Sequence, residues 1–468
     1  RLAVDADGGD GWRERSGWED VRGSVRLGGG TERRRWRAGL WLRSDDHEIP
    51  GSLPRDLFES APRTSLDPFD EARRKRATLG WQEARRGDVW QLDSHVSLRV
   101  QDDRITETLL TETKQRRFDG SQLWAEQRAQ RAFGTAGRHA LVCGVELFAD
   151  RFGSQYFDVD AQGDAGAETA DGDGRRRGVG AYAQAQLAPA PPVRVLLGIR
   201  ADRVHDRFDE SRIPDVSARA SHGAWAPRAG VLWTPRPGTG LYVNAARTFR
   251  VPTPFQLFDQ RRPFGVPVTN DALEPQVGRN VGLGWRQDAG RRGHAEIALY
   301  QLDLKDEIGF DPVAFRLENI GRSRHRGVEA SFDWLHGPFS LALSWTLQDA
   351  RFRSGDFDGN RIDNVPRSTG TLAASWTRAG WQAGLVVRSV RDAFLDPGET
   401  ERLPDYETVA LRLSRAVGAF DIRLEGHNLL DEEYASWGFL SPLDGTPRYY
   451  PATARTVTLD LRYRTGGP

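Results

Sequence analysis

The sequence predicts a large antiparallel β-barrel that spans a membrane. Three observations indicate it: apolar and charged residues alternate along many segments, short breaks alternate with long polar segments, and no stretch approaches the roughly 18 apolar residues of a spanning helix. Because only alternate residues of a barrel strand face lipid, a mean hydropathy of −0.60 with 28% charged residues is compatible with a membrane location.

The alternation has a period of two, which is the period of a strand with two different faces. Near the C-terminus, Phe420, Ile422 and Leu424 alternate with two acidic residues and an arginine, and residues 456–463 repeat the pattern. A fully charged face is hard to bury between the sheets of a soluble sandwich, whereas the lumen of a barrel accepts it. The pattern therefore predicts outward apolar rows and inward charged rows, with aromatics such as Trp36, Trp41 and Trp345 at the membrane boundary.

The connections alternate in length, as they do in barrels with short turns at one end and long loops at the other. Short Gly- or Pro-rich breaks fall at residues 28–31, 85–88, 134–137, 189–192, 235–238, 290–293, 336–338, 377–380 and 416–418. Long polar segments between them lie at about 45–73, 153–177, 204–221, 249–276, 353–364, 393–404 and 431–454. This spacing predicts about 22 strands, within a range of 20–22, in one barrel domain over residues 1–468.

Composition excludes several classes of function. Equal numbers of basic and acidic residues, 66 of each, argue against nucleic acid as a partner. Cys143 is the single cysteine, so the sequence predicts neither an internal disulfide nor a cysteine-based metal site. The sequence also lacks the nucleophile-elbow, zinc-protease and phosphate-loop motifs, and we expect no enzyme activity. The first residues show neither a Met nor an apolar leader, so we interpret the chain as the barrel part of a larger protein.

Several segments resemble the barrel of TonB-dependent outer-membrane transporters. Residues 245–258 carry a Phe-Arg-x-Pro-Thr core followed by a Leu, and residues 270–276 resemble the Asn-x-x-Leu-x-Pro-Glu element, with Gln276 in place of the usual Glu. Residues 318–329 match an Asn-x-Gly and Gly-Val-Glu pair, and residues 427–434 match an Asn-Leu-x-Asp-x-x-Tyr element. Pro451 and Arg455 lead into a final strand, and residues 49–54 resemble an early Pro-Gly loop. The order and spacing of these motifs carry the resemblance.

The resemblance implies import of a scarce ligand across the outer membrane of a Gram-negative bacterium, most simply a ferric siderophore or similar metal chelate. It also implies an N-terminal plug, which is not recognisable in this sequence and through which the TonB complex would supply energy, and contact with outer-membrane lipid and lipopolysaccharide. Cobalamin or oligosaccharide uptake by the same mechanism is an alternative. A passive or substrate-specific porin is the main rival from another class.

We expect the family motifs to act in the structure rather than to bind cargo. A rigid turn with an inward arginine, a close backbone approach at glycine, and side-chain bonds that tie off the penultimate strand are the expected roles. The residues concerned are Phe249, Arg250, Pro252, Asn319, Gly321, Gly327, Glu329, Asn428, Asp431, Tyr434 and Arg455.

Ligand capture is expected from bulky aromatic and cationic side chains on the long loops. Guanidinium groups match carboxylate or phosphate oxygens bidentately, and aromatic rings cover apolar ligand surface. The candidates are Tyr156, Phe258, Gln260, Arg261, Arg262, Arg316, Tyr434 and Trp437.

One acidic segment resembles the start of a calcium loop, although we otherwise expect no cofactor. Asp158, Asp160 and Asp164 lie at alternate or nearby positions with Gly163 at the sixth position, but Thr169 occupies the twelfth position, where a bidentate glutamate is expected. The first positions of this segment fit calcium binding, and a solvated loop is the simpler interpretation.

Overall fold

The computed structural model consists almost entirely of strands, and it describes residues 1–109, 112–213, 217–259, 268–311 and 316–463. Twenty strands of this described chain form one antiparallel sheet, at the lower end of the predicted range. Each strand pairs with the next main strand along the chain, so the sheet is a continuous up-and-down meander. No helix among the described residues is long and apolar enough to cross a membrane.

The first ten strands of the sheet, in order of pairing, are β1 (Leu2–Gly9), β2 (Trp18–Gly30), β3 (Arg34–Glu48), β5 (Glu71–Arg86), β6 (Gln91–Leu109), β7 (Glu112–Phe133), β8 (His139–Val159), β9 (Ala165–Ala190), β10 (Val193–Glu210) and β11 (Ala218–Arg236). The other ten are β12 (Thr239–Arg250), β15 (Gln276–Asp288), β16 (Gly293–Lys305), β19 (Arg322–His336), β20 (Phe339–Phe352), β21 (Ser368–Arg378), β22 (Trp381–Arg391), β25 (Tyr406–Val417), β26 (Phe420–His427) and β29 (Thr456–Tyr463).

Smaller elements lie in the connections. They are β4 (Leu53–Pro54), α1 (Arg55–Ser60), α2 (Pro254–Leu257), β13 (Phe258–Asp259), β14 (Val268–Thr269), β17 (Ile308–Asp311), β18 (Arg316–Asn319), β23 (Ala393–Phe394), β24 (Arg402–Leu403), β27 (Ala435–Leu440) and β28 (Pro447–Pro451). Among them, β4, β28 and β27 form a three-stranded sheet of their own.

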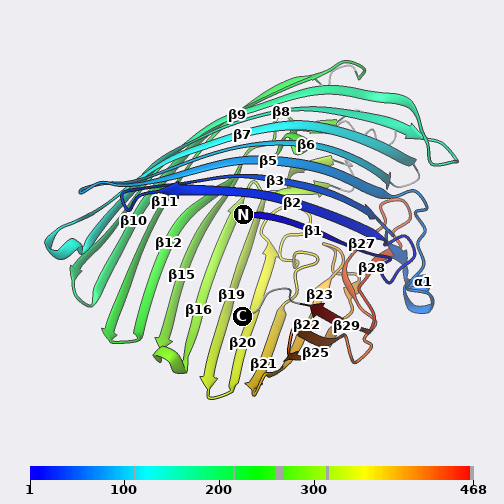
Figure 1. The fold of residues 1–468 in the computed structure, drawn as a ribbon. Helices are drawn as coiled ribbons and strands as arrows, with labels where there is room; N and C mark the ends of the chain where they lie inside the picture. Colours follow the sequence, from blue (N-terminus) through cyan, green and yellow to red (C-terminus); the bar gives the residue numbers. More distant parts are fainter. Residues whose placement is uncertain (110–111, 214–216, 260–267, 312–315, 464–468) are drawn as a thin grey trace.

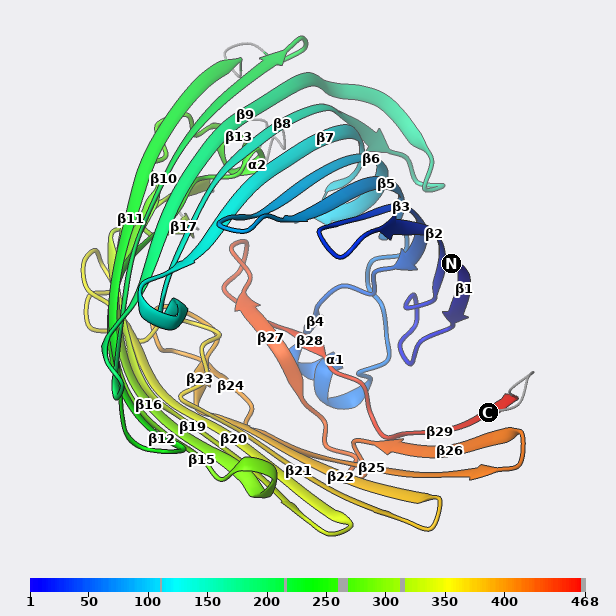
Figure 2. The same cartoon turned by 60° about the vertical axis from the view of Figure 1, so that its left-hand side comes forward.

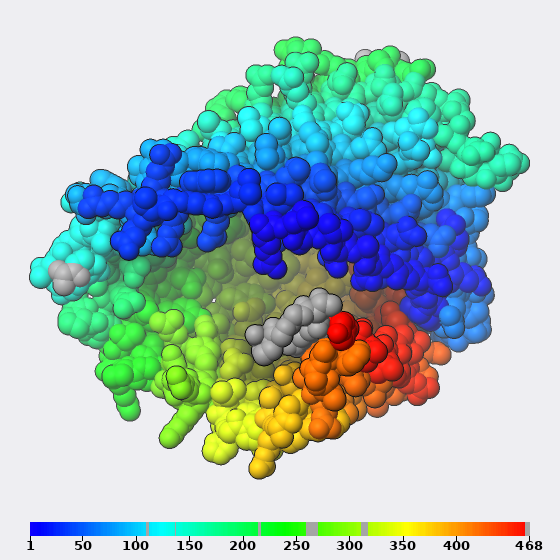
Figure 3. All heavy atoms as spheres, viewed as in Figure 1, coloured from blue at the N-terminus to red at the C-terminus, as the bar shows by residue number. Residues whose placement is uncertain are grey.

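The sheet curls into a barrel-shaped wall (Figure 1). Figure 2 shows β1 and β29 as the two edges of this wall, and no pairing joins them within the described residues. The space-filling view shows the hollow interior between the N-terminal and the C-terminal strands (Figure 3). The small sheet of β4, β27 and β28 lies inside the ring of wall strands in Figure 2.

The predicted difference between the two ends is confirmed. All nine predicted breaks are short turns between paired strands, for example β2 to β3, β19 to β20 and β25 to β26. We call this the turn end and the opposite end the loop end. The prediction was wrong in detail at residues 153–177 and 204–221, which are mostly strand, because polar strands pair with one another beyond the apolar band.

Paired residues reveal the two faces of the wall. On β20, Leu343, Trp345 and Leu347 alternate with Ser344 and Thr346, and the same division continues into β19 and β21 without a register shift. The apolar set forms the outer face and remains substantially exposed, as side chains that face lipid would be.

Trp41 is an exception to the prediction of a boundary aromatic. It lies on the inner face, where its ring covers Gly39 and Gly80 on the same and the neighbouring strand, within 3.0 Å of the Cβ position that an alanine would occupy at either glycine. Glycine is needed there because no other residue leaves room for the flat indole ring.

Tyrosines of the inner face bridge alternate strands in a similar way. The hydroxyl of Tyr242 on β12 donates to Glu296 on β16 at 2.7 Å, and its ring crosses Gly284 on the strand between them. The same arrangement is formed by Tyr182 over Gly144 to Glu126, and by Tyr300 over Gly327 to Gln348. These bridges stiffen the wall from inside.

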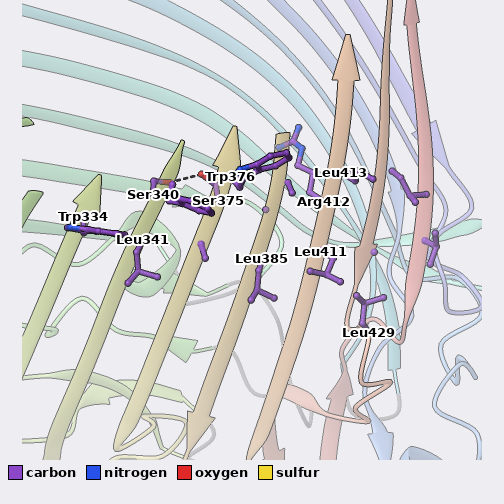
Figure 4. A pocket seen from close by; sticks show the side chains of 17 residues that line it. Trp334, Ser340, Leu341, Ser375, Trp376, Leu385, Leu411, Arg412, Leu413 and Leu429 are labelled. Carbon is purple, nitrogen blue, oxygen red and sulfur yellow. Dashed lines mark hydrogen bonds between the residues drawn. The ribbon is translucent and has the colours of Figure 1, made fainter. Parts of the chain in front are cut away.

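The outer face of β19 to β29 contains an apolar hollow of about 710 Å³. Figure 4 shows Leu341 on β20, Leu385 on β22 and Leu411 on β25 beside it. Small residues such as Ala374 and Gly426 leave the space, which lipid chains would fill in a membrane.

Two hydrophobic clusters lie at the loop end. The first loop core contains Tyr156, Ala170, Phe208, Ile213, Ala220, Leu257, Phe258 and Leu273. The second loop core contains Leu53, Phe58, Ala393, Leu395, Leu403, Ala435 and Tyr449. The first core fixes connections against wall strands, and the second packs connecting segments against one another. The loop end is therefore a built structure.

The assignment of faces makes a direct prediction. Leu343→Arg, on the outer face, should lower the free energy of unfolding in lipid by about 2–4 kcal/mol, whereas Ser344→Arg on the adjacent inner position should be tolerated because Ser344 is exposed in the lumen. Urea titration of the protein in lipid vesicles measures both. Equal effects of the two substitutions would contradict the assignment.

Candidate ligand-binding site at the loop end

The inner faces of β5, β6 and β7 carry a group of arginines near the loop end. In the strand register, Arg74 on β5 lies opposite Asp103 on β6, and Asp103 lies opposite Phe118 on β7. On the same face, Arg76 lies two residues from Arg74 toward the turn end, and Arg116 lies two residues from Phe118 toward the loop end. On the outer face the apolar row has already ended at this height, since Lys75 and Asp102 follow Ala77 and Val100. The arginine group therefore lies in the lumen, on the loop-end side of the apolar band.

Two of these guanidinium groups are uncommitted. Within the part of the chain that the structure describes, Arg76 and Arg116 form no hydrogen bond or close ion pair, and Nε of each has no partner. Arg74 lies 3.8 Å from Asp45, which is its one ion pair within 4 Å among the described residues. The Asp103 carboxylate interacts electrostatically with all three arginines, so the group carries one acid against three cations, and half-buried guanidinium groups that form no hydrogen bond in the described residues can bind an anion.

An aromatic surface adjoins the arginines. Phe255 of α2 is 40% exposed and lies 5.4 Å from Phe118 and 6.0 Å from Phe152 between ring centroids. The guanidinium of Arg116 lies 5.0 Å from the Phe255 ring, a cation–π contact. Cation and ring together form a surface for a ligand that is both anionic and aromatic or apolar.

The sequence of α2 explains how Phe255 is held. Thr253 accepts the backbone N–H of Gln256, and the Gln256 side chain accepts the backbone N–H of Thr253, which is a capping box. Leu257 is completely buried in the first loop core. The short helix therefore has one anchored face, and it presents Phe255 from the other.

A second candidate surface is the β27–β28 hairpin. Trp437, Phe439 and Tyr450 lie on one face, with Trp437 5.4 Å from Phe439 and 5.2 Å from Tyr450. Gly438 and Tyr449 on the other face contact the second loop core. Trp437 is 45% exposed, so the hairpin presents an aromatic face with Arg448, paired with Phe439, beside it.

Asp67, in the segment before β5, has a carboxyl group whose pKa is raised. Burial, with a smaller contribution from Asp70, raises the pKa of Asp67 to about 6, although Arg448 and Arg13 oppose the shift. The folded state thus retains a proton that the unfolded state loses near pH 4. The stability contributed by protonated Asp67 is complete below about pH 4 and is lost as the pH rises to about 6.

We therefore expect the segment 48–71 and β28 to open more readily at pH 7.5 than at pH 5, after correction for intrinsic exchange rates. Asp67→Asn should remove this difference, and Asp56→Asn, at an exposed position of α1, is the matched control. Hydrogen exchange measured by mass spectrometry tests it. The same pH dependence in both variants would disprove the role of Asp67.

The structure separates the ligand candidates predicted from the sequence. Tyr156 and Phe258 are 4% and 3% exposed in the first loop core, so neither offers a surface to a ligand without opening that core. Trp437 belongs to the exposed hairpin face, and Tyr434 stacks on Tyr406 at 4.1 Å. Arg316 pairs with Asp311 through the β17–β18 backbone, while Gln260, Arg261 and Arg262 lie outside the described residues.

A buried ion pair between two wall strands supports the motif around Pro252. Phe249 and Arg250 end β12, and the carbonyl of the buried Pro252 accepts from Arg176. Arg176 in turn pairs with Asp206 at 2.7 Å.

The later motifs tie neighbouring loops together. Asn319 bonds the backbone of Glu274 at 2.9 Å and of Asp306 at 2.8 Å, next to Gly321 at a positive φ of 96°. Gly327 lies beneath Tyr300, and Glu329 lies on the inner face opposite Ala298. After β26, Asn428 bonds Glu432 and Thr453, and Asp431 accepts from the backbone of Arg455.

The acidic segment between β8 and β9 does not gather its carboxylates. Asp158 pairs with Lys114 at 2.6 Å, and Asp160 accepts the backbone N–H groups of Gln162 and Asp164 at 2.9 Å. Among the described residues there is no group of three or more side chains arranged to hold a metal ion.

Sequence reasoning missed Arg74, Arg76, Arg116 and Phe255. The alternation of inward and outward residues could have identified two of them, because residues 74 and 76 fall on the inner face of a strand that begins at Glu71. What the sequence did not show is that their neighbours leave them without partners.

The sequence matches the model of the family described as "TonB dependent receptor-like, beta-barrel" over residues 8–429. The chain therefore belongs to the TonB-dependent receptors, whose members are outer-membrane β-barrels of Gram-negative bacteria. Because these proteins are transporters and receptors, the family assignment also confirms that the chain is not an enzyme.

Curated relatives support this assignment. The chain is 28% identical to the metal-pseudopaline receptor CntO of Pseudomonas aeruginosa strain UCBPP-PA14 over 290 residues, which are 58% of this chain and 39% of that receptor. The corresponding receptor of strain PAO1 is 28% identical over 301 residues, 60% of this chain and 40% of that protein. The chain thus spans about two fifths of the length of these relatives.

Solved structures share the fold. The ferric citrate transporter FecA in its unliganded form has a TM-score of 0.84 at 17% identity, covering 98% of this chain and 72% of that chain. The ferric yersiniabactin uptake receptor FyuA from Yersinia pestis gives 0.81 at 17% identity, covering 99% and 74%. The copper transporter OprC gives 0.80 at 15% identity, covering 99% and 75%.

Proposed function

We propose that the full-length protein imports a scarce anionic metal chelate, such as a ferric siderophore, across the outer membrane of a Gram-negative bacterium. The TonB complex would supply the energy, acting through the plug that the family resemblance implies. Arg74, Arg76 and Arg116, with Phe255, would bind the chelate where it enters the lumen.

The observation that carries this proposal is the pair of uncommitted guanidinium groups of Arg76 and Arg116 above the apolar band. Some other luminal arginines in the described residues are paired with carboxylates; Arg43, for instance, bonds Asp20 and Arg200 bonds Asp202. A carboxylate or catecholate chelate would contact both the guanidinium groups and the aromatic ring beside them.

The names of the relatives favour a metal chelate over cobalamin or oligosaccharide. The curated relatives are receptors for metal-pseudopaline, and the structural neighbours include transporters of ferric citrate, ferric yersiniabactin and copper. An anionic chelate also fits the charge of the candidate site, while a neutral oligosaccharide has no group that requires three arginines.

Equilibrium titration of the purified full-length receptor tests the class of cargo. We expect tryptophan fluorescence to change on addition of anionic ferric carboxylate or catecholate chelates, and the affinity to fall with increasing salt because the contact is electrostatic. Cyanocobalamin and a neutral oligosaccharide are the controls. Preferential binding of either control would contradict the proposal.

A further inference from the structure

Unpaired arginines continue along the inner face of the wall from the candidate site toward the turn end. The first step leads from Arg76 on β5 to Arg99 on β6, which lies opposite Thr78, the next inner residue of β5. The second step leads to Arg26 on β2, which is in register with Gly80, the inner residue of β5 after Thr78. Each step advances by about 7 Å along the strands, and the strands concerned are neighbours in the wall (Figure 2).

Two arginines of β3 extend the series to the turn end. Arg37 lies opposite Gln82 and Arg35 lies opposite Ala84, the next two inner positions of β5. Each inner position of β5 from Arg76 onward is thus matched by one arginine, on β5 itself or on β2, β3 or β6. The series covers about 27 Å along the strands, so after strand tilt it crosses most of an apolar band that is roughly 25 Å tall. We call the four residues beyond the candidate site the arginine ladder: Arg99, Arg26, Arg37 and Arg35.

The ladder arginines have no partners in the part of the chain that the structure describes. None of their guanidinium groups forms a hydrogen bond, an ion pair or a ring contact there, and all four side chains are exposed. From the register of Arg76 to the turn end, the inner positions of β2, β3 and β5 carry no acid, and those of β6 carry none from Gln101 to His95. On another part of the wall, by contrast, Arg412 pairs with Glu425 at 2.9 Å.

One aromatic ring lies within the ladder. Trp41 on β3 is 41% exposed, and its indole ring covers Gly39 and Gly80. These two glycines share the register of Arg26. The inner face therefore offers a flat apolar surface among the cations, the same combination of ring and guanidinium that the candidate site has in Phe255 and its neighbouring arginine.

We propose that the arginine ladder carries an anionic chelate through the lumen after its release from the candidate site, an inference that rests on the proposed function. Guanidinium groups donate hydrogen bonds to carboxylate or catecholate oxygens, and a row of cations without acids raises the local concentration of an anion. Several binding positions of modest strength let a ligand both enter and leave each one. An anion that leaves one rung finds the next about 7 Å further along the strands.

The experiment uses the full-length receptor with Arg26→Gln, Arg37→Gln and Arg99→Gln, the ladder variant. The probe is ferric citrate or a ferric tris-catecholate, whichever the wild-type receptor binds more tightly. Affinity of the purified ladder variant should stay within twofold of wild type, because the candidate site is unchanged. Initial uptake of the iron-55-labelled probe by cells with TonB, at saturating concentration and equal receptor level, should fall tenfold or more. Lysine at the same three positions should restore most of the rate, because it keeps the charge.

The control variant removes the same charge from the lumen at positions that are not in series. Arg286→Gln on β15, Arg388→Gln on β22 and Arg462→Gln on β29 change inner, exposed arginines of other parts of the wall. Uptake by this control should stay within twofold of wild type.

Uptake by the ladder variant at the wild-type rate, or an equal loss in the control, would overturn the proposal. A lower melting temperature of the ladder variant without recovery of uptake in the lysine variant would also overturn it, since the arginines would then hold another segment of the protein. A wild-type receptor that binds no anionic chelate would overturn the proposed function as well. Intact binding and TonB dependence with no effect of the ladder variant would overturn the ladder alone.

Discussion

Replacing Arg74, Arg76 and Arg116 together by glutamine is expected to lower the affinity of the full-length receptor for an anionic ferric chelate by at least about 100-fold. A hydrogen bond to a charged group contributes about 1.5–3 kcal/mol, and each 1.4 kcal/mol is a factor of ten in affinity. Loss of two such contacts therefore gives the stated effect. Titration of the purified variant by fluorescence or calorimetry measures it.

The matched control is a triple variant at the turn end, with Arg236, Arg291 and Arg292 changed to glutamine. These arginines are exposed and lie in or beside short turns, far along the strands from the candidate site. The control keeps the same change in net charge, so it separates a local contact from a general electrostatic effect. A comparable loss of affinity in both triple variants would show that the arginines of the candidate site do not bind the chelate directly.

The fold was largely predictable because the barrel wall repeats one simple rule. Alternation along strands such as β26 and β29 identifies the two faces, and the Gly- and Pro-rich breaks identify the turns. These are local signals, and each is present several times in the sequence. The strand count was therefore predicted to within two.

The loop end was less predictable because its structure depends on contacts between distant segments. Tyr156 and Phe258 are of residue types that often bind ligands, but both are buried in a core assembled from β8, β9, β10, β11, α2 and β13. Nothing local in the sequence shows which polar strands continue beyond the membrane. The same limit explains why the lack of hydrogen-bond partners for Arg76 and Arg116 in the described residues was not foreseen.

Trp437 and Phe255 illustrate the difference between residue type and placement. Both belong to segments that the sequence marked, yet only the structure shows that Gly438 and Leu257 anchor the opposite faces of their elements. An aromatic side chain becomes a ligand surface when its neighbours hold it in place and leave its own face open. That condition is set by packing and has no signature in composition.

Uptake by the full-length protein is expected to depend completely on TonB. A high-affinity site at the mouth retains its ligand, so transport requires a separate source of energy to release it; a passive channel releases a weakly bound solute by diffusion. The family assignment and the uncommitted arginines together predict transport that requires a separate source of energy. The difference in uptake is expected to be all or none, which makes it the largest effect in this account.

Accumulation of an iron-55-labelled anionic chelate should therefore be measured in a receptor-deletion strain that carries the full-length gene, with and without functional TonB. Uptake should be restored only in the strain that has TonB, and the arginine triple variant should restore little in either strain. Equal uptake in both strains would show that the barrel is a passive pore and that energised import is wrong.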